Sequence, residues 1–165
     1  TTPWRGADRP AAIEAAMKEL GLKTAILKTV RFGYDGKGQA VFKKGAAAGA
    51  AWKALGKAPL IIETPVDFAC EISCIIARDK LGQTALYGPI LNEHKNHILS
   101  RSTVPAAIPD DLAGKARDMT RLLADAVDLV GVLALEMFVT RDGRILANEI
   151  APRTHNSGHW TIDAC

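Results

Sequence analysis

The sequence contains no run of about 18 consecutive apolar residues, which a membrane-spanning helix requires. We therefore expect no part of the chain to span a membrane. The first residues, TTPWRGADRP, lack both the charged and the apolar segments of a secretion signal. The chain also lacks an initiator methionine, so we expect a processed chain or a fragment.

Cysteine is scarce, with three residues in 165, and no pair has the CxxC spacing of a zinc or redox site. An odd number of cysteines favours reduced thiols, as in a cytosolic protein, over a disulfide or zinc framework. The formal net charge is only +3, and Lys and Arg are scattered, which argues against nucleic acid as a partner. A small anionic ligand is compatible with this charge.

The composition is otherwise typical of a soluble globular protein, with 48% hydrophobic and 24% charged residues. A chain of 165 residues can form one sizeable core or two small lobes that share a site. Helices and strands are predicted without strict strand–helix–strand alternation, which indicates an α+β fold with mainly antiparallel sheets. Because Thr64-Pro65 interrupts the pattern, we expect a hinge there, between a smaller lobe over 1–64 and a larger lobe over 65–165.

Hydrophobic periodicity and turn residues predict the positions of the elements. The first helix is expected to be capped by Asp8 and to end at Gly21, and the last to be capped by Asp110 and to end at Gly131. A middle helix is expected over 46–55. Strands are predicted over residues 24–30, 40–43, 60–62, 68–76, 83–87, 98–104, 132–140 and 144–150, with a long loop in the rest of 88–109.

Two glutamates are predicted to face each other across a hairpin. Asp142-Gly143 between two alternating apolar runs indicates a two-residue turn, and counting outward from it places Glu136 opposite Glu149. Directly opposed like charges destabilise a sheet. A cation between the carboxylates would remove the conflict, and hard oxygen ligands with Asn148 beside them suit magnesium. The alternative is a solvent-facing pair that binds nothing.

The segment GYDGKGQ, residues 33–39, resembles two phosphate-binding loops and matches neither. Gln39 follows Gly38 where a Walker A loop has lysine, and Val41 stands where the dinucleotide motif has its third glycine. Because a strand is expected next, a phosphate could be bound only by backbone N–H groups and Lys37. A hairpin turn without a ligand fits the same pattern.

Two charged residues lie inside predicted apolar strands. Lys28 stands in the run AILKTV, so its ammonium group must either extend to solvent or meet an anion. Glu71 follows the alternation that starts at Phe68, which places it on the strand face opposite the apolar side chains.

Four segments together resemble a family of ATP-grasp enzymes in purine biosynthesis, the 5-(carboxyamino)imidazole ribonucleotide synthases. These segments are LKTVRFGYDGKGQ, IIETPVDFACEIS, LALEMFV and NEIAPRTHNSGHWT. The last string is highly specific to that family, whereas the others alone would suggest only the ATP-grasp fold. The resemblance runs from about Leu22 onward, and it implies a fragment that lacks the family's N-terminal domain and its C-terminal end.

The resemblance implies that the chain binds ATP and Mg²⁺. By this resemblance Lys28 contacts the phosphates, GYDGKGQ closes over them, Glu63 and Val66 form the adenine hinge, and Glu71 holds the ribose. The metal carboxylates are Glu136 and Glu149. The full ATP-binding set that it implies is Lys28, Gly33, Tyr34, Asp35, Gly36, Lys37, Gly38, Gln39, Glu63, Val66, Glu71, His94, Asn148 and Glu149.

The resemblance also implies a carbon–nitrogen ligase whose substrates are 5-aminoimidazole ribonucleotide and bicarbonate. Bicarbonate attacks the γ-phosphate of ATP, and the resulting carboxyphosphate delivers CO2 to the exocyclic amine. Lys37 and Arg153 are the implied catalytic residues, and Arg153 can bind an oxyanion bidentately. The implied substrate-binding residues are Tyr34, Lys37, Arg153, His155, Asn156 and Ser157, while Thr154 departs slightly from the family pattern.

The sequence is also compatible with other functions. The chain could belong to another ATP-grasp carboxylase or ligase, or it could bind nucleotide without turnover. The segment 153–159 could be a loop whose polar residues cap a helix. We expect His97 and His159 to be structural, a cytoplasmic location, no nucleic-acid or membrane partner, and a homodimer for the complete family enzyme.

Overall fold

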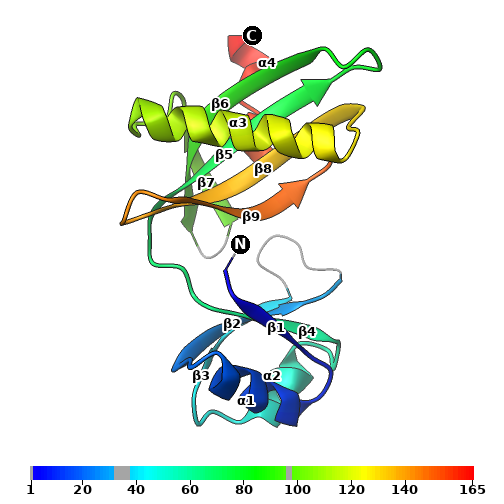
Figure 1. Cartoon of the computed structure of the whole chain (residues 1–165), viewed down its shortest axis with the longest axis vertical. Helices are drawn as coiled ribbons and strands as arrows, with labels where there is room; N and C mark the ends of the chain where they lie inside the picture. Colours follow the sequence, from blue (N-terminus) through cyan, green and yellow to red (C-terminus); the bar gives the residue numbers. More distant parts are fainter. Residues whose placement is uncertain (1, 32–37, 96–97) are drawn as a thin grey trace. The chain divides into compact units, whose positions relative to one another are not determined.

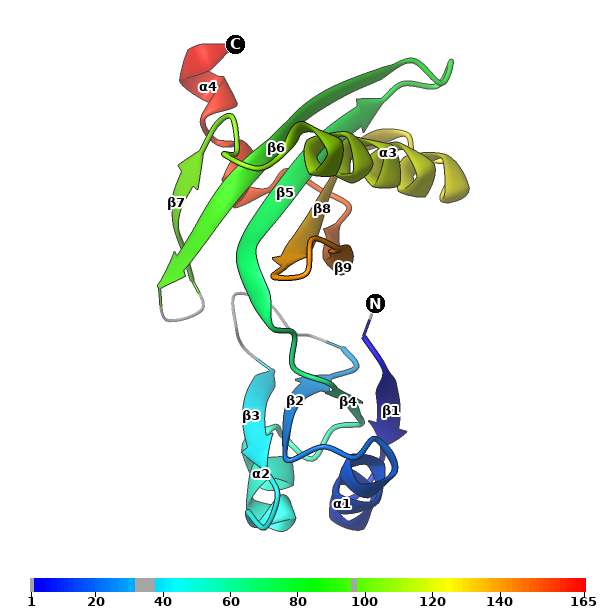
Figure 2. The same ribbon diagram turned by 60° about the vertical axis from the view of Figure 1, so that its left-hand side comes forward.

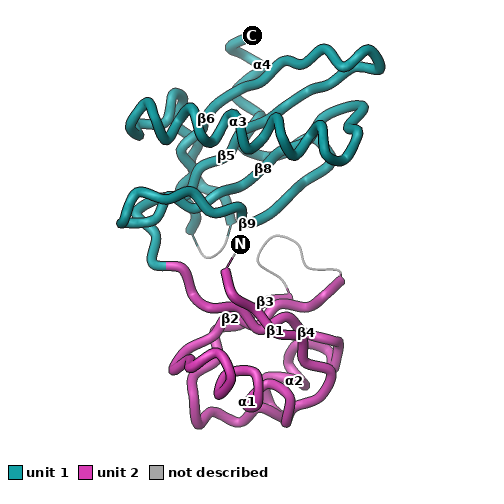
Figure 3. Tube along the Cα trace, viewed as in Figure 1, with its two compact units in different colours: residues 1, 67–165 teal, residues 2–66 magenta. Residues whose placement is uncertain are grey.

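The computed structural model describes residues 2–31, 38–95 and 98–165. These residues form two compact units, Thr2–Val66 and Asp67–Cys165, here called the N-terminal and C-terminal units (Figure 3). Each has a sheet with helices packed on it, so the predicted α+β fold with mainly antiparallel strands is confirmed. In the described part of the chain, no helix is both long and apolar enough to cross a membrane.

The N-terminal unit is a four-stranded antiparallel sheet in the order β1-β4-β2-β3. Its buried core joins alternating strand residues such as Leu27 and Ile62 to Ile13 and Met17 of the first helix. Two helices therefore cover one face of the sheet (Figure 2). The elements are β1 Trp4–Ala7, α1 Pro10–Glu19, β2 Thr24–Thr29, β3 Gln39–Lys43, α2 Ala48–Ala54 and β4 Leu60–Glu63.

The C-terminal unit is a five-stranded antiparallel sheet in the order β7-β6-β5-β8-β9 (Figure 1). The long helix α3 covers one face, where Leu112 and Ala116 pack on Ile72, Cys74 and Met137. The elements are β5 Phe68–Arg78, β6 Thr84–Lys95, β7 Ile98–Thr103, α3 Asp110–Ala126, β8 Gly131–Thr140, β9 Ile145–Ala151, the short 3-10 helix η1 Asn156–Gly158 and α4 Thr161–Ala164.

The opposite face of the C-terminal sheet is only partly apolar. Ile75, Ile90, Ala134 and Ala151 form a small buried cluster there, against which Trp160 packs. The rest of this face carries polar and charged side chains from all five strands. The sheet therefore separates a structural face under α3 from a face that offers polar groups.

Both predicted aspartate caps are wrong. Helix α1 begins at Pro10 with Arg9 at its N-cap, and α3 begins at Asp110 with Pro109 at its N-cap; neither cap makes a side-chain hydrogen bond. Proline fixes φ near helical values, so Pro10 can open α1 without a polar cap. Asp110 instead lies in the first turn of α3, where a negative charge is favourable to the helix dipole.

Gly131 does not end helix α3, which stops at Ala126. Gly131 instead opens β8 with a φ of 124°. Strand β1 was not predicted, because three of its four residues are exposed and show no apolar pattern. The loop predicted within 88–109 is also largely wrong, because β6 continues to Lys95. A bulge at Gly88 and Pro89 explains this: Ser73 pairs with Ile90 and Ile75 with Tyr87, so β6 carries the extra residue and accommodates the proline.

The bulge gives a stability prediction for Gly88. Its φ is 108°, and a Cβ atom there would lie 2.9 Å from the carbonyl oxygen of Ser73. Gly88→Ala should therefore lower the free energy of unfolding by about 2 kcal/mol, measured by urea denaturation. Gly114→Ala is the control, because a Cβ atom there meets open space on α3, and it should raise stability by about 0.5 to 1 kcal/mol. Equal stabilities for the two variants would contradict this account of the bulge.

Candidate functional site

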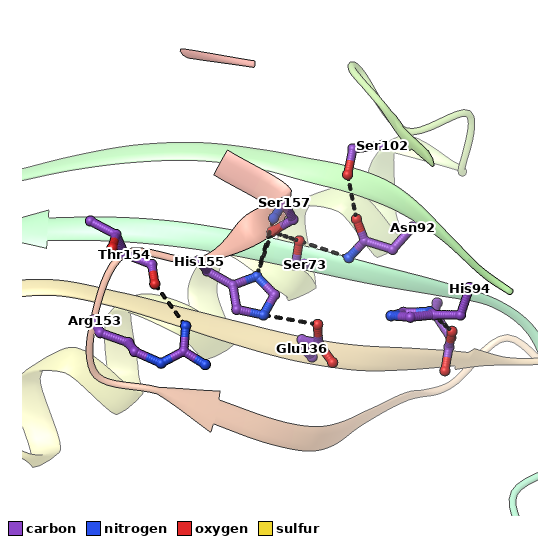
Figure 4. A network of polar contacts seen from close by, with 10 residues as sticks. Ser73, Asn92, His94, Ser102, Glu136, Arg153, Thr154, His155 and Ser157 are labelled. Atoms are coloured by element: carbon purple, nitrogen blue, oxygen red, sulfur yellow. Dashed lines mark hydrogen bonds and ion pairs between the residues drawn. The ribbon is translucent and has the colours of Figure 1, made fainter. Parts of the chain in front are cut away.

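Polar side chains gather on the face of the C-terminal sheet that lies opposite α3 (Figure 4). Strand alternation places them there: Ile72 and Cys74 of β5 face α3, so Glu71 and Ser73 face the other way. The prediction that Glu71 lies opposite the apolar strand face is confirmed. The other members come from the neighbouring strands and from the segment after β9, namely Asn92, His94, Ser102, Glu136, Glu149, Arg153, His155 and Ser157.

Glu136 and Glu149 are direct cross-strand partners, as predicted, but the predicted turn is wrong. Thr140 N–H donates to the carbonyl of Arg144, so three residues form the loop instead of two. By itself the longer loop would shift the register by one residue. A bulge restores it, because Met137 pairs with Ala147 and Glu136 with Glu149, which leaves Asn148 as the extra residue on β9. Loop and bulge therefore compensate each other.

The environment of Glu136 disfavours its charge. Burial, together with the facing carboxylate of Glu149 and that of Glu71, raises the pKa of Glu136 from 4.5 to about 7. Electrostatic interactions with His94 and Arg153 oppose this rise in the pKa of Glu136. The Glu136 side chain is only 16% exposed, so water relieves little of the repulsion. A cation at this pair would favour the ionised form of both carboxylates.

His94 and Glu71 form a second contact on the same face. Nδ1 of His94 lies 2.5 Å from Oε2 of Glu71, and each side chain is 24% exposed. The resemblance assigned both residues to the nucleotide site. The structure brings these two side chains into direct contact across β5 and β6, and their role toward nucleotide stays a prediction.

A chain of hydrogen bonds joins the sheet to the segment after β9 (Figure 4). Ser73 Oγ lies 2.8 Å from Ser157 Oγ and 2.9 Å from Asn92 Nδ2, and Ser102 Oγ lies 3.2 Å from Asn92 Oδ1. His155 connects this chain to Glu136, since Nδ1 lies 2.9 Å from Ser157 Oγ and Nε2 lies 3.2 Å from Glu136 Oε1. The first contact spans 84 positions in sequence, which local patterns do not reveal.

Ser73, Asn92 and Ser102 were missed as site residues. The only sequence signal was that Ser73 shares the strand face of Glu71. Ser157 was assigned to substrate, and the structure shows its side chain fully buried, with its hydroxyl against Ser73 and His155. Its assignment stays a prediction.

The other predicted substrate residues of this unit lie at the exposed edge of the site. Arg153 is exposed and one of its terminal guanidinium nitrogens donates to the carbonyl of Thr154 at 2.9 Å. Asn156 is exposed and opens η1, while Asn148 is half-buried at the β9 bulge. His159, expected to be structural, is exposed and its backbone N–H donates to the carbonyl of Asn156.

The predicted site residues of the N-terminal unit lie on its own sheet. Lys28 Nζ contacts Glu63 Oε2 at 2.8 Å, so the lysine does meet an anion, here a carboxylate of the neighbouring strand. The Gly38 carbonyl accepts from Thr29 N–H, and Gln39 pairs with Lys28. Val66 is half-buried. Gly33, Tyr34, Asp35, Gly36, Lys37 and His97 lie outside the described residues.

The donor set at the carboxylate pair fits magnesium. Within the described ranges, no group of three or more His, Cys, Asp or Glu side chains is arranged to hold a metal. Two opposed carboxylates are nevertheless sufficient for Mg²⁺, which usually takes one or two carboxylates and completes its shell with water and phosphate oxygens. The electrostatic conflict that raises the pKa of Glu136 is the one that such a cation would relieve.

Comparisons with known proteins agree on one family. The model of the ATP-grasp domain family matches residues 1–165. The N5-carboxyaminoimidazole ribonucleotide synthase of Brucella melitensis is 49% identical over the whole chain, which spans 46% of that relative's length. A crystal structure of an N5-carboxyaminoimidazole ribonucleotide synthetase in complex with ADP has a TM-score of 0.92 and 43% identity, with 100% of this chain and 44% of that chain covered.

A second similar structure contains two ligands. It is the N5-carboxyaminoimidazole synthase of Aspergillus clavatus in complex with ADP and 5-aminoimidazole ribonucleotide, with a TM-score of 0.85 and 28% identity. The match covers 99% of this chain and 43% of that chain. The chain therefore spans less than half the length of these similar proteins.

The raised pKa of Glu136 predicts a pH dependence of stability in the absence of metal. Between its ordinary pKa of 4.5 and its folded pKa of about 7, the folded state keeps a proton that the unfolded state has lost. The free energy of unfolding should therefore fall as the pH rises through this window, by up to about 3 kcal/mol. Urea denaturation with a chelator at about pH 5 and about pH 8 measures the fall. Glu136→Gln removes this ionisation and should show a smaller fall, whereas parallel profiles would contradict the pKa assignment.

Proposed function

Because the chain belongs to the ATP-grasp domain family, we propose that it binds ATP and Mg²⁺ as part of an enzyme that carboxylates 5-aminoimidazole ribonucleotide with bicarbonate. The products are 5-(carboxyamino)imidazole ribonucleotide, ADP and phosphate. The observation that carries the proposal is the pairing of Glu136 with Glu149 on a face that also holds Arg153 and His155. The names of the similar proteins, and the two substrates bound in one of them, support it.

The chemistry suits the residues of this face. A bicarbonate oxygen attacks the γ-phosphorus of ATP, the bond to the β-phosphate oxygen breaks, and ADP leaves. Carboxyphosphate then releases CO2 and phosphate, and the exocyclic amine forms the new C–N bond and loses a proton. Phosphoryl transfer of this kind depends mainly on positioning and on neutralising negative charge.

Glu136 and Glu149 would hold the magnesium ion, which when bound neutralises charge on the phosphate oxygens. Arg153 is exposed beside this pair, where its guanidinium group can bind an oxyanion of bicarbonate or carboxyphosphate with two hydrogen bonds. His94 and Glu71 lie on the same face, at hydrogen-bond distance from each other, and offer polar groups to the nucleotide.

In the N-terminal unit, Lys28 would contact a phosphate of ATP, with Glu63 holding the lysine chain in place. Their contact of 2.8 Å involves side chains that are 30% and 26% exposed, so the ammonium group is accessible to a ligand. We place the enzyme in the cytoplasm, and the three free cysteines are compatible with that reducing compartment.

Phosphate release tests the reaction itself. The purified chain with ATP, magnesium and bicarbonate should release phosphate faster when 5-aminoimidazole ribonucleotide is added, because the acceptor drains carboxyphosphate. Omission of bicarbonate is the control and should abolish the stimulation. If ATP binds and the ribonucleotide changes neither binding nor phosphate release, the chain is a nucleotide-binding module and the carboxylation proposal fails for it.

The carboxylate pair gives a binding prediction. Glu149→Gln keeps the size of the side chain and removes one charged ligand, so the affinity for ATP in the presence of magnesium should fall at least about tenfold. Calorimetric titration measures this affinity. Asp118→Asn is the control, because this exposed residue lies on α3, on the other side of the sheet, and loses the same charge. Unchanged affinity in Glu149→Gln would contradict the magnesium site.

A further inference from the structure

Three buried or half-buried polar residues, Ser73, Asn92 and Ser102, have no role in the reaction proposed above. Ser73 is fully buried and Asn92 is 4% exposed, so each hydrogen bond that they make stands in for lost contact with water. Together with Ser157 they form a continuous line from β7 to the ring of His155.

The ring of His155 fixes the end of the line. The backbone N–H of Ser157 donates to Nδ1 of His155 at 3.3 Å, so this ring nitrogen acts as an acceptor and carries no proton. The hydroxyl of Ser157, 2.9 Å from the same nitrogen, must then donate to it as well. In a neutral ring the proton lies on Nε2, which faces Oε1 of Glu136 at 3.2 Å.

The remaining bonds run in the same direction. Because the Ser157 hydroxyl donates its hydrogen bond to His155, the Ser157 hydroxyl oxygen can accept a hydrogen bond from Ser73 at 2.8 Å. Ser73 in turn accepts from the side-chain amide of Asn92, which is a donor at Nδ2 only. The amide oxygen of Asn92 accepts from Ser102. Every proton along the line therefore points toward Glu136.

The opposite direction conflicts with the backbone. If each hydroxyl donated the other way, the ring proton would lie on Nδ1, and the backbone N–H of Ser157 would face a second donor at that atom. Burial increases the cost of such a conflict, because no water can replace the lost bond.

We propose that Ser102, Asn92, Ser73 and Ser157 form a directed hydrogen-bond relay that, together with the backbone N–H of Ser157, keeps the ring proton of His155 on Nε2, facing Glu136. These residues act as positioning residues, because they orient His155, which in turn holds the carboxylate plane of Glu136 through Oε1. In metal sites, outer partners of this kind fix the orientation of a ligand and affect metal affinity about 10- to 100-fold. That consequence rests on the proposed function, whereas the position of the ring proton does not.

The position of the proton can be measured directly. With 15N-labelled histidine, the nitrogen signals report which ring nitrogen is protonated, and His155→Gln identifies the signals of His155 among four histidines. Spectra are recorded at increasing pH up to about pH 9, and those that no longer change with pH report the neutral ring. Measured without nucleotide or magnesium, the chain should show His155 in the Nε2–H form alone.

Two variants test the relay itself. Ser73→Ala interrupts the line and leaves only the longer backbone contact of Ser157, at 3.3 Å, to hold Nδ1 as an acceptor, so the Nδ1–H form should appear beside the Nε2–H form. Asn92→Asp is isosteric, and its carboxylate can only accept hydrogen bonds. Ser73 should therefore donate to this carboxylate, Ser157 should donate to Ser73, and the Nδ1–H form of His155 should increase further. Ser100→Ala, an exposed position on the same strand as Ser102, should leave the spectrum unchanged. Because Asn92→Asp keeps the shape of the side chain, a change in the His155 tautomer in this variant would not be explained by lost packing.

The relay is overturned if His155 carries its proton on Nδ1 in the parent chain, or if Ser73→Ala and Asn92→Asp both retain the parent spectrum. Should Asn92→Asp fail to fold because of its buried charge, the parent chain and Ser73→Ala decide the matter. In a separate titration, Ser73→Ala should weaken magnesium-dependent ATP binding about tenfold. If the parent chain binds no ATP, the proposed function fails while the spectra still test the relay.

Discussion

The central constraint in this protein is the direct opposition of two carboxylates, of which Glu136 is mostly buried and Glu149 is exposed. Glu136 and Glu149 repel each other, and burial raises the cost of ionising Glu136, so the arrangement opposes folding unless something compensates. Among the neighbouring groups, Arg153 and His94 favour the ionised form of Glu136, Glu71 adds to the repulsion, and His155 contacts Glu136 directly. Ionisable groups whose pKa is strongly shifted by burial and by a like charge are typical of functional sites, and a bound cation would relieve this repulsion.

The hairpin shows how this opposition is maintained. A three-residue loop between β8 and β9 shifts the register by one, and the bulge at Asn148 shifts it back. Because a shift of one residue moves every side chain to the other face, either change alone would separate the two carboxylates. The loop and the bulge are therefore one structural unit, and Asn148 is placed beside the pair as a result.

Sequence reasoning found those features that depend on short-range alternation. The strand face of Glu71 and the cross-strand partner of Glu136 both follow from the two-residue period of a strand. The partner of Glu136 was predicted correctly even though the predicted turn was wrong. Sequence reasoning did not predict contacts between residues far apart in the sequence, such as the hydrogen bond between Ser73 and Ser157 and the ion pair between Lys28 and Glu63. The cap at Asp110 failed for another reason: an aspartate near a helix start has two favourable positions, cap and first turn, which a pattern cannot separate. Asp8 lies in neither position, because Arg9 is the N-cap of α1 and Pro10 begins the helix.

The order of strands also has a mechanical consequence. The two units are joined at Val66 and Asp67, and β5, the central strand of the C-terminal sheet, begins one residue later at Phe68. Hydrogen bonds to β6 and β8 stand perpendicular to this strand on both sides. A pulling force on the junction would therefore load these bonds together, in shear, instead of breaking them one at a time. The strand that carries Glu71 and Ser73 is thus anchored along its length against tension from the N-terminal unit.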